Sequence, residues 1–175
     1  MTYTLAGGCF WCLDAVFRRL KGVESSVSGF TGGTTPNPGY YDVAMGMTDY
    51  AESVQITFDE SVLPPEVLLD LFFAIHNPTT LNRQGADVGS QYRSAMFYEN
   101  EQQKTLFENA KKRAATLWSD DPIVTEIVPL DMFYPAPDEH QDYFNKNPSS
   151  GYCSIVIEPK IIKARQKFSE YWRRD

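Results

Sequence analysis

Two of the three cysteines in this 175-residue chain, Cys9 and Cys12, are separated by only two residues, and Cys153 lies far downstream. An odd number of cysteines at uneven spacing does not fit the disulfide framework of a secreted protein. In a reducing compartment a Cys-x-x-Cys pair is typically catalytic or metal-binding, because thiolates are nucleophiles and metal ligands. The pair therefore predicts thiol chemistry, either at the sulfur atoms themselves or at a bound metal.

The residues around Cys9 predict that it lies where a strand turns into a helix. Residues 2–6 read as a short strand, a Gly-Gly turn follows, and the apolar residues of 10–21 recur at helical spacing. The first turn of a helix has free N–H groups that favour negative charge, so we expect a stabilised thiolate at Cys9. Phe10 and Trp11, between the cysteines, predict an apolar wall beside that nucleophile.

Strands and helices follow one another irregularly, which predicts an α+β fold: a two-layer sandwich with a mixed, mostly antiparallel sheet around a β-α-β core. We expect further strands over 23–30, 52–59, 93–99, 123–128 and 153–157, and further helices over 65–76, 100–116, 137–144 and 160–172. In the first of these strands, Val23, Ser25 and Val27 would share one face. Segments 31–41 and 77–91 predict long loops, which in compact domains are often functional.

Length and composition predict a single catalytic domain over residues 1–175. Hydrophobic residues make up 42% of the chain and charged residues 22%, which excludes disorder and collagen-like repeats. No stretch approaches the ~20 apolar residues of a membrane span, and the first residues do not read as a secretory signal. We therefore expect a cytoplasmic protein without a membrane partner. A net charge of −7 argues against a nucleic-acid partner.

Several blocks of the sequence resemble the methionine sulfoxide reductase A family. Residues 7–11, Gly-Gly-Cys-Phe-Trp, are similar to its active-site signature. Further blocks follow in the family order: Gly-Phe-Thr-Gly-Gly at 29–33, Asn-Pro-Gly-Tyr at 37–40, Ala-Glu at 51–52, Gln-Gly-Ala-Asp-Val-Gly-Ser-Gln-Tyr-Arg-Ser at 84–94 and Glu-His-Gln-Asp-Tyr at 139–143. The blocks cover nearly the whole chain, so the resemblance is highly specific as a set.

The resemblance implies a thiol-dependent enzyme that reduces methionine sulfoxide, as the S epimer, free or in proteins, and so repairs oxidative damage. Cys9 would attack the sulfoxide sulfur and become a sulfenic acid, while Glu52 would donate the proton that the departing oxygen requires. A carboxyl group beside Phe10 and Trp11 would be partly desolvated, which favours its protonated form. No metal or organic cofactor is needed.

The resemblance also implies which residues bind the substrate. Phe10 and Trp11 would enclose the methyl group of the sulfoxide. Tyr40 and Tyr92 match the oxygen-side tyrosines of the family and would donate hydrogen bonds to the sulfoxide oxygen. Asp87 would have an orienting role.

Three residues depart from the family pattern. Phe30 replaces a tyrosine, Asn77 replaces an aspartate, and Tyr50 occupies the place where a histidine often precedes Ala-Glu. Tyr50 lies closest to the proposed acid, so we expect the hydrogen bonds and the pKa of Glu52 to differ from those usual in the family.

A second thiol must attack the sulfenic acid at Cys9, and the sequence leaves two candidates. Cys153 resembles the resolving cysteine of many family members, and Cys12 stands where some members have this second cysteine. Either Cys12 closes a short disulfide with Cys9, or Cys153 attacks first and Cys12 then exchanges. The resemblance implies that thioredoxin reduces the resulting disulfide.

Two other functions fit the cysteines. A thioredoxin-like disulfide exchanger would use Cys9 and Cys12 and would need neither a proton donor nor a methyl pocket. A zinc site built from Cys9, Cys12, Cys153 and His140 would contain ligand types that suit tetrahedral zinc. Outside such a site, His140 and His76 are expected to be structural.

Overall fold

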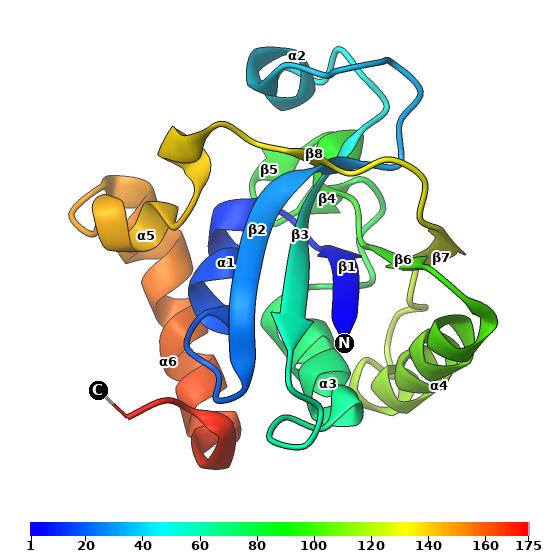
Figure 1. Cartoon of the computed structure of the whole chain (residues 1–175), viewed down its shortest axis with the longest axis vertical. Coiled ribbons are helices and arrows are strands. Elements are labelled where there is room, and N and C mark those ends of the chain that lie inside the picture. The colour runs from blue at the N-terminus through cyan, green and yellow to red at the C-terminus, as the bar shows by residue number, and fades with distance from the viewer. Residues whose placement is uncertain (175) are drawn as a thin grey trace.

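A computed structural model describes residues 1–174 and confirms the α+β architecture (Figure 1). A six-stranded sheet has the order β7-β6-β1-β3-β2-β8. Its strands are β1 Thr2–Ala6, β2 Val23–Thr31, β3 Ala51–Phe58, β6 Ala95–Tyr98, β7 Glu126–Pro129 and β8 Tyr134–Pro135. The β6–β7 pair is parallel, and the other four pairs of this sheet are antiparallel, as predicted.

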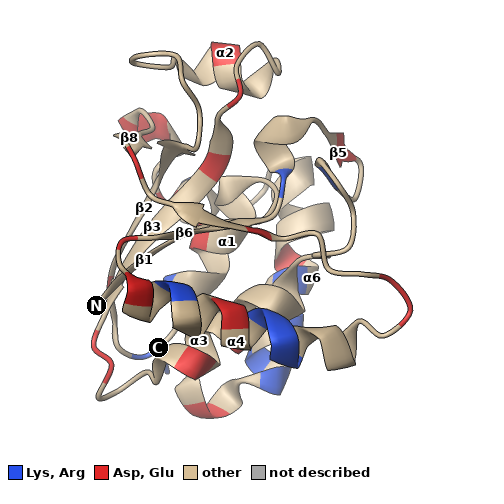
Figure 2. Ribbon diagram, turned by 90° about the vertical axis from the view of Figure 1, so that its right-hand side faces the viewer, with Lys and Arg blue, Asp and Glu red and all other residues tan. Residues whose placement is uncertain are grey.

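The helices lie outside the sheet, and most of them form the second layer (Figure 1). They are α1 Phe10–Phe17, α2 Tyr40–Ala44, α3 Pro65–Ile75, α4 Glu101–Leu117, α5 Tyr143–Lys146 and α6 Glu158–Lys167. The α1 helix packs on β2 and β3, α6 contacts both α1 and α3, and α3 in turn contacts α4 (Figure 1). Lys and Arg gather on this layer, around α4 and α6, whereas Asp and Glu are more widely spread (Figure 2). Within residues 1–174 no helix is long and apolar enough to cross a membrane.

The expected β-α-β unit is present, with β3 inserted between its two strands. β1 pairs with β3 from Thr2↔Thr57 to Leu5↔Val54, and β2 pairs with β3 as far as Thr31↔Ala51. The end of β1 therefore lies beside the start of β3. This register brings the turn that carries Cys9 close to Glu52.

The prediction that Val23, Ser25 and Val27 share one face of β2 is wrong. The register of β2 on β3 shifts between Val23 and Ser25, which marks a bulge. One extra residue reverses the inward and outward positions of the residues that follow it. Ser26 and Ser28 are consequently buried, whereas Ser25 is exposed.

The prediction of a last strand over 153–157 is also wrong. This segment is a π-helical turn, η3 Cys153–Ile157, which runs directly into α6. A short apolar run does not distinguish a strand from a helix by periodicity alone. Cys153 and Ile157 are buried and lie four residues apart, while Ser154 and Ile155 between them are exposed. That spacing is the pattern of a helical face.

Several predicted elements have different bounds. The α1 helix ends at Phe17, four residues early, because Gly22 turns the chain at a φ of +87° and Leu20 forms an antiparallel bridge with Trp172. β7 and α6 are also shorter than predicted, and segment 137–144 divides into η2 Asp138–His140 and α5. The two predicted loops hold short elements of their own: α2 in the first, and the hairpin β4 Arg83–Gln84 with β5 Asp87–Val88 and the 3-10 turn η1 Ser90–Tyr92 in the second.

His76 has the expected structural place. Its ring is buried, with Nδ1 2.5 Å from the Phe72 carbonyl oxygen and Nε2 2.8 Å from Ser94 Oγ. Burial lowers the pKa of His76 to about 3, so the ring is neutral in the folded protein.

We expect His76 to make the fold sensitive to mild acid. The pKa of His76 is about 3 in the folded protein, whereas its ordinary value is 6.5. Between these two pH values the unfolded chain binds a proton at His76 and the folded chain does not. The free energy of unfolding should fall by about 2 kcal/mol through this group between pH 7 and pH 5. Urea unfolding at the two pH values measures the loss, which should shrink by that amount in His76→Gln. The matched variant His140→Gln should keep most of the loss of unfolding free energy between pH 7 and pH 5. An unchanged loss in His76→Gln would contradict the prediction.

Candidate active site

Cys9 occupies the N-cap position of α1 and is 8% exposed. The turn before it depends on Gly8, whose φ is +91°, a conformation that other residues rarely adopt. A Cβ atom on Gly8 would also lie 2.7 Å from Cγ of Gln84. The Cys9 carbonyl accepts the Cys12 N–H at 3.1 Å and so begins the first helical turn. The chain is thus held tightly where the sulfur leaves the backbone.

Glu52 lies under this helix start, on β3. Its side chain is buried, and Oε1 accepts a hydrogen bond from the Phe10 N–H at 3.2 Å. Desolvation by burial raises the pKa of Glu52 to about 8, although the Phe10 hydrogen bond acts in the opposite direction. The negative charge of Asp87 raises this pKa further. Glu52 is therefore mainly protonated near neutral pH and can donate a proton.

The expectation of a stabilised thiolate at Cys9 is wrong for this structure. Desolvation raises the pKa of the Cys9 thiol well above its ordinary value, and the neighbouring Cys12 and Glu52 side chains raise it further. A helix terminus contributes only about 0.3–1 kcal/mol to a nearby charge, whereas burial of an unpaired charge costs several times more. The thiol is therefore protonated, and an approaching reactant must help to remove its proton.

Cys12 is buried one helical turn along α1 and belongs to a short polar chain. Its Sγ lies 3.6 Å from the Tyr152 hydroxyl, which in turn lies 2.8 Å from Oδ2 of Asp87. The hydrogen-bonding interaction with Cys9, assisted by the positive charge of Lys160, lowers the pKa of Cys12 to about 7. The Lys160 charge and the Tyr152 hydroxyl both favour the thiolate form of Cys12.

Cys153 is fully buried in η3, where its backbone N–H donates to Ser150 Oγ at 3.2 Å. All three cysteines are free thiols. The interactions that shift the pKa values of Cys9 and Cys12 involve each other's side chains and do not include Cys153. The structure thus brings two of the three predicted redox cysteines into direct interaction and keeps the third inside the helical layer.

A stack of aromatic rings borders the reactive turn. The indole of Trp11 lies flat on the ring of Tyr143, with centroids 3.6 Å apart and an interplanar angle of 6°. Tyr40 stacks on His140 at 3.8 Å, and its ring lies 6.3 Å from that of the buried Phe10. His140 therefore packs against aromatic rings of the candidate site. The apolar wall that the sequence predicts is present, and it is larger than expected.

Tyr40 and Tyr92 lie within the electrostatic influence of the same centre. Burial raises the pKa of both phenols, to about 12 for Tyr40, and the charges of Glu52 and Cys9 contribute to both shifts. Both hydroxyls therefore keep their protons and act as donors. The ring of Tyr40 packs near that of Phe10, and the η1 turn that contains Tyr92 contacts β3, the strand that contains Glu52.

The three departures from the family pattern have separate structural settings. Tyr50 donates a hydrogen bond to the Thr35 carbonyl, so its hydroxyl is directed to that loop. Asn77 Oδ1 accepts from both the N–H and the hydroxyl of Thr79, at 3.0 and 2.6 Å. The ring of Phe30 packs 5.6 Å from that of Phe10.

Sequence reasoning missed Tyr152, Tyr143 and Lys160. Tyr152 precedes Cys153 directly, and Tyr143 ends the Glu-His-Gln-Asp-Tyr block, so both positions carried a signal. Lys160 lies in a basic segment with no recognisable motif. Its place beside the cysteines depends on how η3 and α6 pack against α1.

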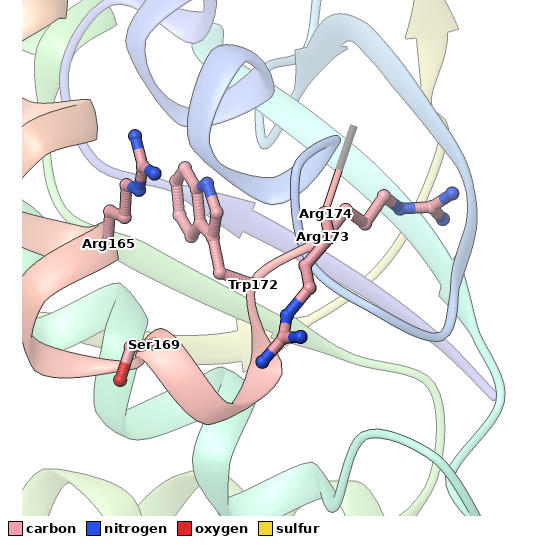
Figure 3. Close-up of a pocket in the computed structure, with 5 residues that line it drawn as sticks. All are labelled: Arg165, Ser169, Trp172, Arg173 and Arg174. Carbon is pink, nitrogen blue, oxygen red and sulfur yellow. The ribbon is translucent and has the colours of Figure 1, made fainter.

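One cavity of about 520 Å³ reaches the reactive thiol. Its wall is made by Cys9, Gln84, Gly85, Ala86, Asp87, Tyr152, Ile155, Val156, Pro159 and Lys160. A second hollow, of about 440 Å³, lies near the C-terminus, where Arg165 and Arg174 extend away from one another (Figure 3). That hollow contains arginines, Ser169 and Trp172 but no cysteine. The first cavity gives access to Cys9 and Asp87 among the predicted site residues, whereas the predicted acid and the predicted substrate-binding aromatic residues do not line it: Glu52, Phe10, Trp11, Tyr40 and Tyr92.

The zinc alternative gains no support from the arrangement of ligands. Over residues 1–174, no group of three or more His, Cys, Asp or Glu side chains is placed to hold a metal ion.

Comparisons with known proteins found a matching family model, similar sequences and similar solved structures. A family model described as peptide methionine sulfoxide reductase matches residues 1–172. The chain is 57% identical over 170 residues to "Peptide methionine sulfoxide reductase MsrA" of Paenarthrobacter aurescens, covering 97% of each chain. It is similar to reduced Mxr1 from Saccharomyces cerevisiae, with a TM-score of 0.81, 34% identity and coverage of 87% and 88%. It is also similar to Mxr1 in complex with Trx2, with a TM-score of 0.58, 26% identity and coverage of 82% and 84%.

We expect Glu52→Gln to stabilise the protein near neutral pH. The folded pKa of Glu52 is about 8 against an ordinary 4.5, so its stabilising contribution is complete below pH 4.5 and is lost as the pH rises toward 8. A glutamine has no such loss and still accepts from Phe10. The free energy of unfolding at pH 7 should therefore exceed that of the wild type by about 2–3 kcal/mol, with no gain at pH 4.5. Denaturant unfolding with thiol reductant measures the difference, and Glu24→Gln, at an exposed strand position, is the control. A gain equal at both pH values would refute this explanation.

Proposed function

The chain belongs to the peptide methionine sulfoxide reductase family, and we propose that it reduces the S epimer of methionine sulfoxide, free or in proteins, through Cys9 and Glu52. The observation that carries this assignment is the buried Glu52 carboxyl, whose pKa is raised to about 8 and which bonds to the first turn of α1 beside Cys9. A protonated carboxyl next to a buried thiol suits the removal of oxygen from sulfur.

The first step transfers oxygen from the substrate to Cys9. Cys9 loses its proton as its sulfur attacks the sulfoxide sulfur, while Glu52 protonates the sulfoxide oxygen. The oxygen then moves from the substrate sulfur to the Cys9 sulfur: the substrate S–O bond and the transient S–S bond break as a Cys9 S–O bond forms, which leaves methionine and a sulfenic acid at Cys9. The substrate sulfur is reduced by two electrons and Cys9 is oxidised by two. Glu52 recovers its proton from the Cys9 thiol, so atoms and charge balance.

Other side chains hold the sulfoxide during this step. Tyr40 and Tyr92 keep their phenolic protons and donate hydrogen bonds to the oxygen, whose negative charge grows as the S–O bond breaks. Phe10 and Trp11 enclose the methyl group. Asp87 orients the substrate, and its own position is fixed by the Tyr152 hydroxyl at 2.8 Å.

We expect Glu52→Gln to slow oxygen transfer by roughly 100-fold or more, because an amide donates no acidic proton. The wild-type rate should fall as the pH rises through about 8, where Glu52 loses its proton, and Glu52→Gln should lack this fall. Methionine formed in a single turnover without reductant measures the rate, and Glu24→Gln again serves as the control. A rate equal to that of the wild type at neutral pH would exclude Glu52 as the acid.

For the second step we propose that Cys12 resolves the sulfenic acid. Its pKa of about 7 gives a substantial thiolate fraction near neutral pH, and its side chain already interacts with Cys9. The Cys12 thiolate attacks the Cys9 sulfur, the S–O bond of the sulfenic acid breaks, and the oxygen leaves as water after protonation. Cys153 acts later, by exchange with this disulfide. It cannot act first because its fully buried thiol must leave the helical layer before it reacts.

Disulfide mapping by mass spectrometry after one turnover should find Cys9 joined to Cys12 first, in the wild type and in Cys153→Ser. Cys12→Ser should still yield one methionine per chain, because Cys9 alone removes the oxygen, and Cys9→Ser should yield none. A first disulfide between Cys9 and Cys153 would reverse the proposed order. Loss of all turnover in Cys12→Ser would instead favour a disulfide exchanger.

Thioredoxin is the reductant that we propose for the final disulfide. The similar protein Mxr1 has been solved in complex with Trx2, at 26% identity to this chain. We also propose a cytoplasmic location, because an odd number of cysteines at uneven spacing does not fit the disulfide framework of a secreted protein. We take residues 1–175 as one catalytic domain, since the matched region extends from residue 1 to 172.

A further inference from the structure

Lys160 is a positive charge beside the reactive cysteines, and the oxygen-transfer step proposed above gives it no role. It lies on α6, is half-buried, and lines the cavity of about 520 Å³ that reaches Cys9. Its charge lowers the pKa of Cys12 and contributes to the lowered pKa of His76.

Over residues 1–174, the Lys160 ammonium forms neither an ion pair nor a hydrogen bond. By contrast, the Lys111 ammonium donates to the Thr125 carbonyl at 2.9 Å, and that of Lys146 donates to the Asp138 carbonyl at 2.8 Å. A half-buried cation without a partner retains much of its capacity to bind an anion.

The same cavity is lined by one acidic side chain, Asp87, which is held in place by a hydrogen bond. Asp87 accepts the Tyr152 hydroxyl at 2.8 Å, and its negative charge raises the pKa of Glu52. Much of the remaining wall is neutral, including Ile155 and Val156. A carboxylate on a ligand is therefore repelled near Asp87 and attracted near Lys160. These two charges orient a ligand in the cavity with its carboxylate toward Lys160.

We propose that Lys160 binds a carboxylate of the substrate and so makes the enzyme favour methionine sulfoxide with a free α-carboxylate, as the free amino acid or at a chain terminus. This inference rests on the proposed function, because the reacting sulfoxide must lie at Cys9 for its carboxylate to reach Lys160. An acidic residue directly after an oxidised methionine offers the same chemistry from a second source.

Two substrates that differ by one charge test the proposal: N-acetyl-methionine sulfoxide and its N-methylamide. The ratio of their kcat/KM values, acid over amide, should be about fivefold for the wild type, the effect of a partly exposed ion pair. The ratio should decrease at high salt because the attraction is screened. Lys160→Gln should reduce it to about one, and Lys160→Arg should retain it. Lys163→Gln, an exposed position on the same helix, is the matched control and should leave the ratio unchanged.

The parameter kcat/KM excludes the disulfide steps, because oxygen transfer precedes them. The influence of Lys160 on Cys12 therefore does not enter the ratio. A second pair of substrates, N-acetyl-methionine sulfoxide followed by aspartate amide or asparagine amide, separates the two carboxylate sources. If the acidic substrate is preferred through Lys160 only in the first pair, Lys160 binds the α-carboxylate. If it is preferred in both pairs, Lys160 also binds the side-chain carboxylate of a following acidic residue.

Three results would overturn the proposal: a wild-type ratio near one in the first pair, a preference that Lys160→Gln leaves intact, or equal losses of kcat/KM for acid and amide in that variant. Equal losses would mean that Lys160 supports α6 or Cys12 and not the substrate. Failure of the proposed function is a different observation, namely that the wild type reduces neither substrate.

Discussion

The hydrogen bond from the Phe10 N–H to the Glu52 carboxyl is the interaction on which the site depends. It joins the first turn of α1 to the start of β3, and the antiparallel register of β1 on β3 brings these two segments together. The same register buries the carboxyl, and burial keeps its proton in place near neutral pH. The hydrogen bond to Phe10, the burial of the Glu52 carboxyl and its raised pKa thus all follow from the pairing of β1 with β3.

Around this bond the protein maintains a dry, aromatic environment that opposes charge. Burial raises the pKa of Cys9, Glu52, Tyr40 and Tyr92 together, so the resting centre carries protons and little charge. Such a centre suits a reaction whose leaving oxygen needs a proton. The arrangement makes the site a source of reduced stability at the pH where the enzyme works, as is common for functional sites.

Much of the fold and the site could be predicted from sequence where short-range signals were strong. The turn before Cys9, the N-cap of α4 at Asn100 and the alternation in β3 all follow from local residue types. The protonation of Cys9 could not, because it depends on burial by distant segments. The bulge in β2 and the π-helical turn η3 also lay outside local rules, since both are set by packing on the sheet and on α1. Lys160 reaches the site only through that packing.

The continuity of η3 with α6 links two parts of the catalytic cycle mechanically. Cys153 at one end and Lys160 in the first turns of α6 belong to a single helical rod. The exchange proposed for Cys153 requires its buried thiol to leave the helical layer, so the turn that must rearrange is continuous with the helix that carries Lys160.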